Sequence, residues 1–212
     1  MVTSMRLLDH PIASAKLIGG RLCLDFVNTC AGRNSDGTVI EDRLLDFTDL
    51  AAWANRAALE SGPAAQKMIA DAVRDPAAAA KIRERAAVLR EACYRLFRGV
   101  LHQKPASAED VAILNREWTE ALRHRMLAPG STCLQLKWTG SDALDRTLWA
   151  VAESAVQLLA SPHTASLKEC GGVRCGWLFE DSSRNLNRQW CDMQSCGTLS
   201  KVRRFRERQT QV

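Results

Sequence analysis

The stretch CGGVRCGWLFEDSSRNLNRQWCDMQSCGTLSKVRRFRER (170–208) decides how the C-terminal part of the chain folds, because it contains two evenly spaced pairs of cysteines. Four residues separate Cys170 from Cys175, fifteen follow, and Cys191 and Cys196 repeat the spacing of four. Two close thiol pairs about 15–20 residues apart predict a tetrahedral Zn²⁺ site, with one pair on each side of the ion. Four sulfur ligands leave no position for water, so we expect one structural ion per chain and no catalytic role for it.

The segment that carries these thiols is too short and too polar to bury a sufficient core of its own. A zinc ion would add on the order of 10 kcal/mol to its folding. Glycines at 171, 172, 176 and 197 give the backbone the freedom to point amide groups at the sulfurs. The alternatives are two disulfides or four unrelated buried thiols. We interpret the other four cysteines as small buried side chains. They are Cys23, Cys30, Cys93 and Cys133.

Length and composition indicate an ordinary globular protein. The chain has 212 residues, of which 46% are apolar and 25% charged, and its net charge is +5. It is long enough for one domain with a small appendage, or for two domains. No stretch approaches the roughly 20 apolar residues needed to cross a bilayer, and the N-terminus lacks the apolar segment of an export signal. We therefore expect a cytoplasmic protein with reduced thiols and no membrane contact.

The apolar pattern predicts a mainly helical N-terminal part. GGRLCLDFVNT (19–29) alternates like a strand, TCLQLKW (132–138) does the same, and Ser161-Pro162 ends the helical pattern. The predicted fold class is α+β: a mainly α-helical N-terminal domain with a few short antiparallel strands (1–165), followed by a small treble-clef or ribbon-like zinc module with a basic C-terminal helix (166–212). Helices are expected from a cap at Asp46 or Thr48 to about 62, at 64–72, from about 76 to 103, at 108–124, from a cap at Ser141 to about 160, and at 195–208.

Positive charge gathers at the C-terminal end, where five cations oppose one acid, Glu207. On a helix, Leu199, Val202 and Phe205 share a stripe, which we expect to pack on the zinc module or on the neighbouring domain. The cations on the other sides suit contact with phosphate groups. Alternatively, they offset the charge of −2 on a Zn(Cys)₄ centre. The five cations are Lys201, Arg203, Arg204, Arg206 and Arg208.

Residues 170–208 resemble the CGNR zinc finger. The opening GGRLCLDFVNT is similar to that of the ABATE domain, which commonly precedes this finger in bacterial proteins regarded as stress-induced transcription regulators. The resemblance implies DNA binding by the finger, through Arg188 together with the five C-terminal cations. The CGNR motif is degenerate here, because Thr198-Leu199 replaces Asn-Arg and Arg188-Gln189 replaces a paired arginine. The matching residues are Cys170, Cys175, Gly176, Trp177, Phe179, Asp181, Ser183, Arg188, Trp190, Cys191, Met193, Cys196, Gly197 and Lys201.

The first 160 residues contain no phosphate-binding loop, dinucleotide fingerprint, zinc-protease motif or nucleophile elbow, so we expect no enzyme. Asp25, Asn28 and Thr29 form a polar cluster that is a candidate site for a small effector. Capping of the end of the predicted strand, with an Asx turn, is the commoner explanation. The predicted function is a DNA-binding transcription regulator, which could form a homodimer. The alternative is a zinc-stabilised module that binds protein and not DNA.

Overall fold

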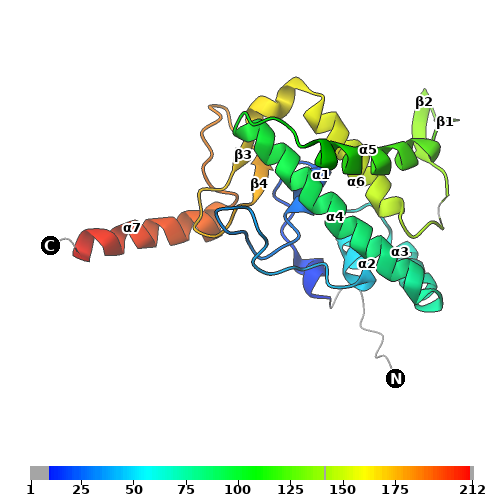
Figure 1. The fold of residues 1–212 in the computed structure, drawn as a ribbon, viewed down its shortest axis with the longest axis horizontal. Helices are drawn as coiled ribbons and strands as arrows, with labels where there is room; N and C mark the ends of the chain where they lie inside the picture. The colour runs from blue at the N-terminus through cyan, green and yellow to red at the C-terminus, as the bar shows by residue number, and fades with distance from the viewer. Residues whose placement is uncertain (1–9, 141, 211–212) are drawn as a thin grey trace.

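A computed structural model describes residues 10–140 and 142–210, and most of these residues are helical (Figure 1). The long helix α4 runs along one face of the body, and the other helices of the N-terminal part pack around it. The helices of this part are α1 (Leu22–Val27), α2 (Phe47–Arg56), α3 (Gly62–Arg74), α4 (Pro76–Leu101), α5 (Ala108–Arg123) and α6 (Arg146–Leu159).

Two of the three helix caps predicted from the sequence are confirmed. Asp46 caps α2 by accepting from the backbone N–H of Asp49, whose carboxylate bonds the Asp46 N–H in return, which completes a capping box. Ser107 accepts from the N–H of Asp110 at the start of α5. The expected cap at Ser141 lies outside the described residues, and α6 begins after Asp145, whose side chain makes no capping bond.

The predicted strand at 19–29 is wrong, because this segment forms helix α1. In the predicted strand, the alternating pattern of apolar residues would put Leu22, Leu24 and Phe26 on one face. Cys23 and Val27 are apolar as well, and the structure buries them completely. Buried positions 23, 24, 26 and 27 follow the spacing of a helix face, so the short apolar run fits both periods. Packing of α1 against α4 and α6 selects the helix.

Two small antiparallel sheets complete the fold. In the first, β1 (Arg125–Pro129) pairs with β2 (Leu134–Trp138), which confirms the strand expected at 132–138. In the second, β3 (Leu167–Glu169) pairs with β4 (Leu178–Glu180). A mainly helical N-terminal region with short antiparallel strands, followed by a four-cysteine module, is the fold class predicted. Cys133 is exposed beside the β1–β2 turn, so its expected burial is wrong.

The core of the body is built from the inner faces of these helices. Cys23, Cys30 and Cys93 are completely buried, as predicted for small core side chains. Trp53 and Trp149 are also buried, whereas Trp118 and Trp138 are half-buried. Within the described residues, no helix combines the length and apolar character that a membrane span requires.

The C-terminal module packs on the body through β4, which lies against α1, and through β3, which lies against α4. After the last cysteine, helix α7 (Thr198–Thr210) leaves the body and projects away from it, at the opposite end of the molecule from the β1–β2 hairpin (Figure 1). The domain boundary near 165 stays a prediction.

Candidate metal centre and nucleic-acid interface

The sulfur atoms of the two cysteine pairs converge on one point. The Sγ atoms of Cys170, Cys175, Cys191 and Cys196 all lie within 4.8 Å of one another. The Sγ atom of Cys191 is 3.6 Å from that of Cys175 and 3.7 Å from that of Cys196. A tetrahedron with Zn–S bonds of about 2.3 Å has sulfur–sulfur edges of about 3.8 Å. The cluster therefore fits one structural Zn²⁺ with four sulfur ligands, whereas a disulfide needs about 2.05 Å.

Backbone amides around the cluster point at the sulfurs. The N–H groups of Gly172 and Cys191 donate to Cys170 Sγ, at 3.4 and 3.2 Å. Such bonds stabilise thiolates and fix the orientation of metal ligands. A Cβ on Gly172 would lie 3.0 Å from Cys196 Sγ, so the absence of a side chain there leaves room for the two pairs to approach.

The four thiols restrict one another's ionisation. Hydrogen bonds from Cys175 and Cys191 lower the pKa of Cys170 to about 2. The same contacts raise the pKa values of Cys175 and Cys191, because the ionised Cys170 needs neutral thiols as donors. Burial is the main cause that raises the pKa of Cys196. Protein groups alone therefore favour one thiolate, and a divalent cation is the species that would stabilise four.

A small apolar cluster surrounds the sulfurs. Phe179 is completely buried beside Cys170 and Cys191, and Trp177 and Trp190 pack against this cluster. Both tryptophans thus belong to the small core of the module, as we expected. The body contributes Ile18 to the same cluster.

Asn28 joins the body to the module. Its side-chain amide donates to the carbonyl oxygen of Leu178 at 2.8 Å, and its Oδ1 accepts from the N–H of Leu178 at 3.0 Å. Asn28 is 4% exposed. Its amide therefore bonds one residue of β4 as a neighbouring strand would, and satisfies two buried backbone groups.

A second contact involves the loop after α1. The N–H of Arg33 donates to the carbonyl oxygen of Cys175, and Trp177 Nε1 donates to that of Cys30, both at 3.1 Å. Gly176 has φ of +59°, and a Cβ there would lie 2.8 Å from Cβ of Arg33. The first cysteine turn therefore packs closely against this loop. Position 176 favours glycine because its φ is positive and because a larger side chain would collide with Arg33.

The buried guanidinium of Arg33 holds that loop in place. It forms two hydrogen bonds with the carboxylate of Glu91, at 2.6 and 3.1 Å, and lies 3.6 Å from the centroid of the Tyr94 ring. It also donates to the carbonyl oxygens of Val27 and Gly37. A buried charge that is paired and hydrogen-bonded in this way fixes the geometry of its surroundings.

Sequence reasoning missed the roles of Asn28 and Arg33 as links to the module. The signal for Asn28 was a polar amide directly after the apolar run of α1, which we interpreted as a turn or a ligand site. The partner of that amide is 150 residues away, so no local pattern could identify it.

The other two residues of the candidate effector site also bond to the protein. Thr29 Oγ1 donates to the carbonyl oxygen of Phe26, and Asp25 Oδ1 accepts from the N–H of Gly19. Burial raises the pKa of Asp25 to about 6. Effector binding by Asp25, Asn28 and Thr29 stays a prediction.

Arg188 lies inside the module. Its guanidinium donates to the carbonyl oxygens of Trp190 and Cys191, and it stacks 4.3 Å from the centroid of the Phe179 ring. These contacts hold together the chain before the second cysteine pair and use much of the guanidinium's donor capacity. A nucleic-acid contact by Arg188 stays a prediction.

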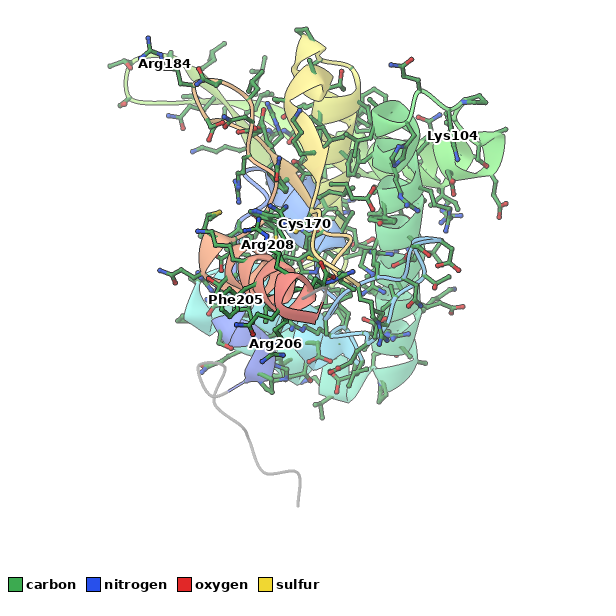
Figure 2. The ribbon with its side chains drawn as sticks, turned by 90° about the vertical axis from the view of Figure 1, so that its left-hand side faces the viewer. Lys104, Cys170, Arg184, Phe205, Arg206 and Arg208 are labelled. Carbon is green, nitrogen blue, oxygen red and sulfur yellow. The ribbon has the colours of Figure 1, made fainter. Side chains whose placement is uncertain are left out.

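The other five cations gather on α7, and all five are exposed. Figure 2 shows α7 end-on, with the labelled side chains of Arg206 and Arg208 spread around it. Arg203 forms an ion pair with Glu207 at 2.7 Å, one turn further along.

The apolar stripe does not pack as we expected: Leu199, Val202 and Phe205 are 69%, 42% and 62% exposed. Because α7 points away from the body, neither the module nor the helices cover this stripe.

Comparison with family models gives two matches, in the order that the resemblance implied. Residues 20–162 match the ABATE model, described as "Putative stress-induced transcription regulator". Residues 166–209 match the CGNR zinc finger model. Neither description is that of an enzyme family. A search of curated proteins found no significant match.

Proposed function

Because this chain belongs to the ABATE family of transcription regulators and ends in a CGNR zinc finger, we propose that it binds DNA through α7 on its zinc module. The observation that carries the proposal is the projection of α7, with five exposed cations against one acid. The structural zinc ion holds the base of this helix, since Cys196 lies two residues before Thr198, where α7 begins. The guanidinium group of an arginine can donate two parallel hydrogen bonds to the oxygen atoms of a DNA phosphate.

Phosphate contact of this kind has a definite salt dependence. Each neutralised phosphate releases bound cations, so the slope of log K against log salt is about −0.9 per contact. We expect the chain to bind duplex fragments of its own genome with an affinity that falls steeply between 50 and 200 mM salt, and fluorescence anisotropy measures this.

The decisive variant carries Arg203→Ala, Arg204→Ala and Arg208→Ala. We expect the affinity to fall at least about tenfold and the salt slope to flatten by about 2 to 3, because three phosphate contacts are lost. The matched control is Arg74→Ala, Arg116→Ala and Arg123→Ala, which removes the same charge from exposed sites on α3 and α5. Equal losses in both variants would show attraction by overall charge and contradict a role for α7.

The exposed stripe on α7 favours a second candidate, a module that binds protein. Leu199 and Phe205 are more than half exposed, and phosphate contact alone does not explain two large apolar side chains in water. In this case a partner would be retained after nuclease treatment and lost in a Leu199→Ser, Phe205→Ser variant. DNA affinity would be absent from the parent protein.

Four further features belong to the proposal. We place the protein in the cytoplasm, with no enzymatic activity, and assign effector binding to its N-terminal part. A homodimer is supported by the exposed apolar side chains of the β1–β2 hairpin, where Leu127, Leu134 and Leu136 are 61%, 66% and 57% exposed. Sedimentation equilibrium of the zinc-loaded chain measures the stoichiometry, and Leu134→Ser with Leu136→Ser should yield a monomer.

A further inference from the structure

A cavity of about 830 Å³ lies where the body meets the zinc module. Its walls come from the N-terminal segment around residues 11–18, from the loop and helix start around residues 41–49, and from the module between Val173 and Leu199. Cavities of this volume hold drug-sized molecules, and ligand sites occur preferentially at junctions of this kind.

Large apolar side chains border this cavity and remain exposed. Leu45, Val173 and Leu199 are 70%, 68% and 69% exposed, and all three line it. They come from the body, from the first cysteine turn and from the first turn of α7. Exposed apolar groups that converge on one cavity from three segments indicate a surface that a ligand covers.

Two guanidinium groups also line the cavity without a partner. Within residues 10–140 and 142–210, the side chains of Arg43 and Arg174 form no ion pair or hydrogen bond, and Arg43 is half-buried. A partly dehydrated cation without a partner is costly, and an anion would offset this cost.

The acidic side chains of the lining do not fill this role. Asp42 forms two hydrogen bonds with Arg90, at 2.6 and 2.8 Å. Asp49 accepts from the backbone N–H groups of Leu45 and Asp46 at the start of α2. Glu41 is exposed, and no ion pair of its side chain is found among the described residues. Lys16 also lines the cavity but is paired with Asp192, so within the described residues Arg43 and Arg174 are the lining cations that have no anionic partner.

From this combination we propose that the cavity binds an amphiphilic anion, with a carboxylate or phosphate headgroup on an apolar body. The headgroup is held by Arg43 and Arg174, and the apolar body covers Leu45, Val173 and Leu199. Cys175, Cys191 and Cys196 also line the cavity, and the formal charge of −2 on a Zn(Cys)₄ centre would repel the headgroup from the sulfurs and favour its binding at the arginines.

A ligand at this place would touch the body and the base of α7 together. Bound to both, it would restrict how α7 sits on the body, and would thereby alter the contact of α7 with its partner. This regulatory consequence rests on the proposed function, whereas the binding itself does not.

The binding is tested on the full-length, zinc-loaded chain with 11-(dansylamino)undecanoate, a fluorescent alkyl carboxylate. We expect saturable binding of one equivalent, and competition by unlabelled dodecanoate or dodecyl phosphate, whichever headgroup fits better. The methyl ester of the probe keeps the apolar body and lacks the charge, so it should bind about 10- to 100-fold more weakly.

Three variants locate the site. Arg43→Gln and Arg174→Gln should each weaken binding about tenfold or more, and Leu45→Trp should weaken it by filling the cavity. The control is Arg184→Gln, an exposed arginine on a module loop distant from Cys170 in Figure 2, which should leave binding unchanged. Circular dichroism and zinc content verify that each variant is folded.

Three results would overturn the proposal: no saturable binding, equal affinity for acid and ester, or equal losses in Arg184→Gln and in the cavity variants. Loss of zinc from Arg174→Gln without loss of probe binding would assign this arginine to the metal centre instead. DNA affinity is measured separately with and without dodecanoate. A chain that binds the probe and not DNA would disprove the proposed function alone.

Discussion

The helical body and the zinc module differ in what holds them together. The body is built around a continuous core of about thirty buried apolar side chains, to which the module adds Leu167 and Leu178, whereas the module's own separate cluster buries Phe179 with Cys170 and Cys191. Burial of apolar surface stabilises the first, at roughly 25 cal/mol per Å². The second must obtain its stability from its ligand and from its contacts with the body. The two parts should therefore respond to different perturbations.

Removal of the metal is expected to have the largest effect, and to affect the module alone. Chelation, or Cys170→Ser with Cys196→Ser, removes on the order of 10 kcal/mol of binding free energy from about forty residues. Hydrogen exchange followed by mass spectrometry should show loss of protection in residues 167–200, while α4 and α6 keep theirs. If β3 and β4 kept their protection after full removal of zinc, the conclusion that the metal stabilises the module would be wrong.

A cavity in the core should have the opposite effect. Leu89 is completely buried in α4, and Leu89→Ala should lower the free energy of unfolding of the body by about 2–5 kcal/mol. Urea unfolding followed by circular dichroism measures this change. The neighbouring Val88 is 39% exposed, so Val88→Ala is the matched control and should change the value by less than about 0.5 kcal/mol. Zinc content should stay at one equivalent in both variants.

The link between the two parts is expected to have an intermediate effect. Asn28→Ala leaves the N–H and C=O groups of Leu178 without partners inside the protein, at a cost of about 1–3 kcal/mol. We expect faster exchange in β4 and faster release of zinc to a chelator, with the zinc content unchanged at the start. Asn187, exposed on a module loop, is the control position, and Asn187→Ala should release zinc at the parent rate.

The sequence predicted best those features that depend on close neighbours. The cysteine spacing identified all four members of the cluster, because both members of each pair belong to one turn. Caps at Asp46 and Ser107 were correct since a cap bonds to a residue three positions away. The exposed cations of α7 could be predicted from the helical period and from their excess over acidic residues alone.

The errors arose where a distant part of the chain decides the outcome. Residues 22–27 form a helix because α4 and α6 accept a helix face there, which no pattern of six residues reveals. The exposure of Leu199 and Phe205 depends on the direction in which α7 leaves the second cysteine pair. That direction follows from the folded module and not from the period of the helix.

The smallest effect expected in this comparison concerns Asp25, a titrating carboxyl in the body near the junction. Burial raises its pKa to about 6 in the folded chain, against an ordinary value near 3.9 in the unfolded one. The folded state therefore binds the proton more tightly, so this group stabilises the fold below about pH 4 and loses that contribution as the pH rises through 6. Asp25→Asn keeps an oxygen to accept from the N–H of Gly19 and removes the ionisation.

The difference in unfolding free energy between the Asn variant and the parent should therefore be near zero at pH 4 and grow to about 1–2 kcal/mol in favour of the variant above pH 6.5. Urea titrations at six pH values measure this difference, in which the protonation of the zinc thiolates cancels because both proteins share it. A difference that is constant with pH would mean that water reaches the carboxylate, and that the junction is more open than the buried contacts of Asn28 and Arg33 imply.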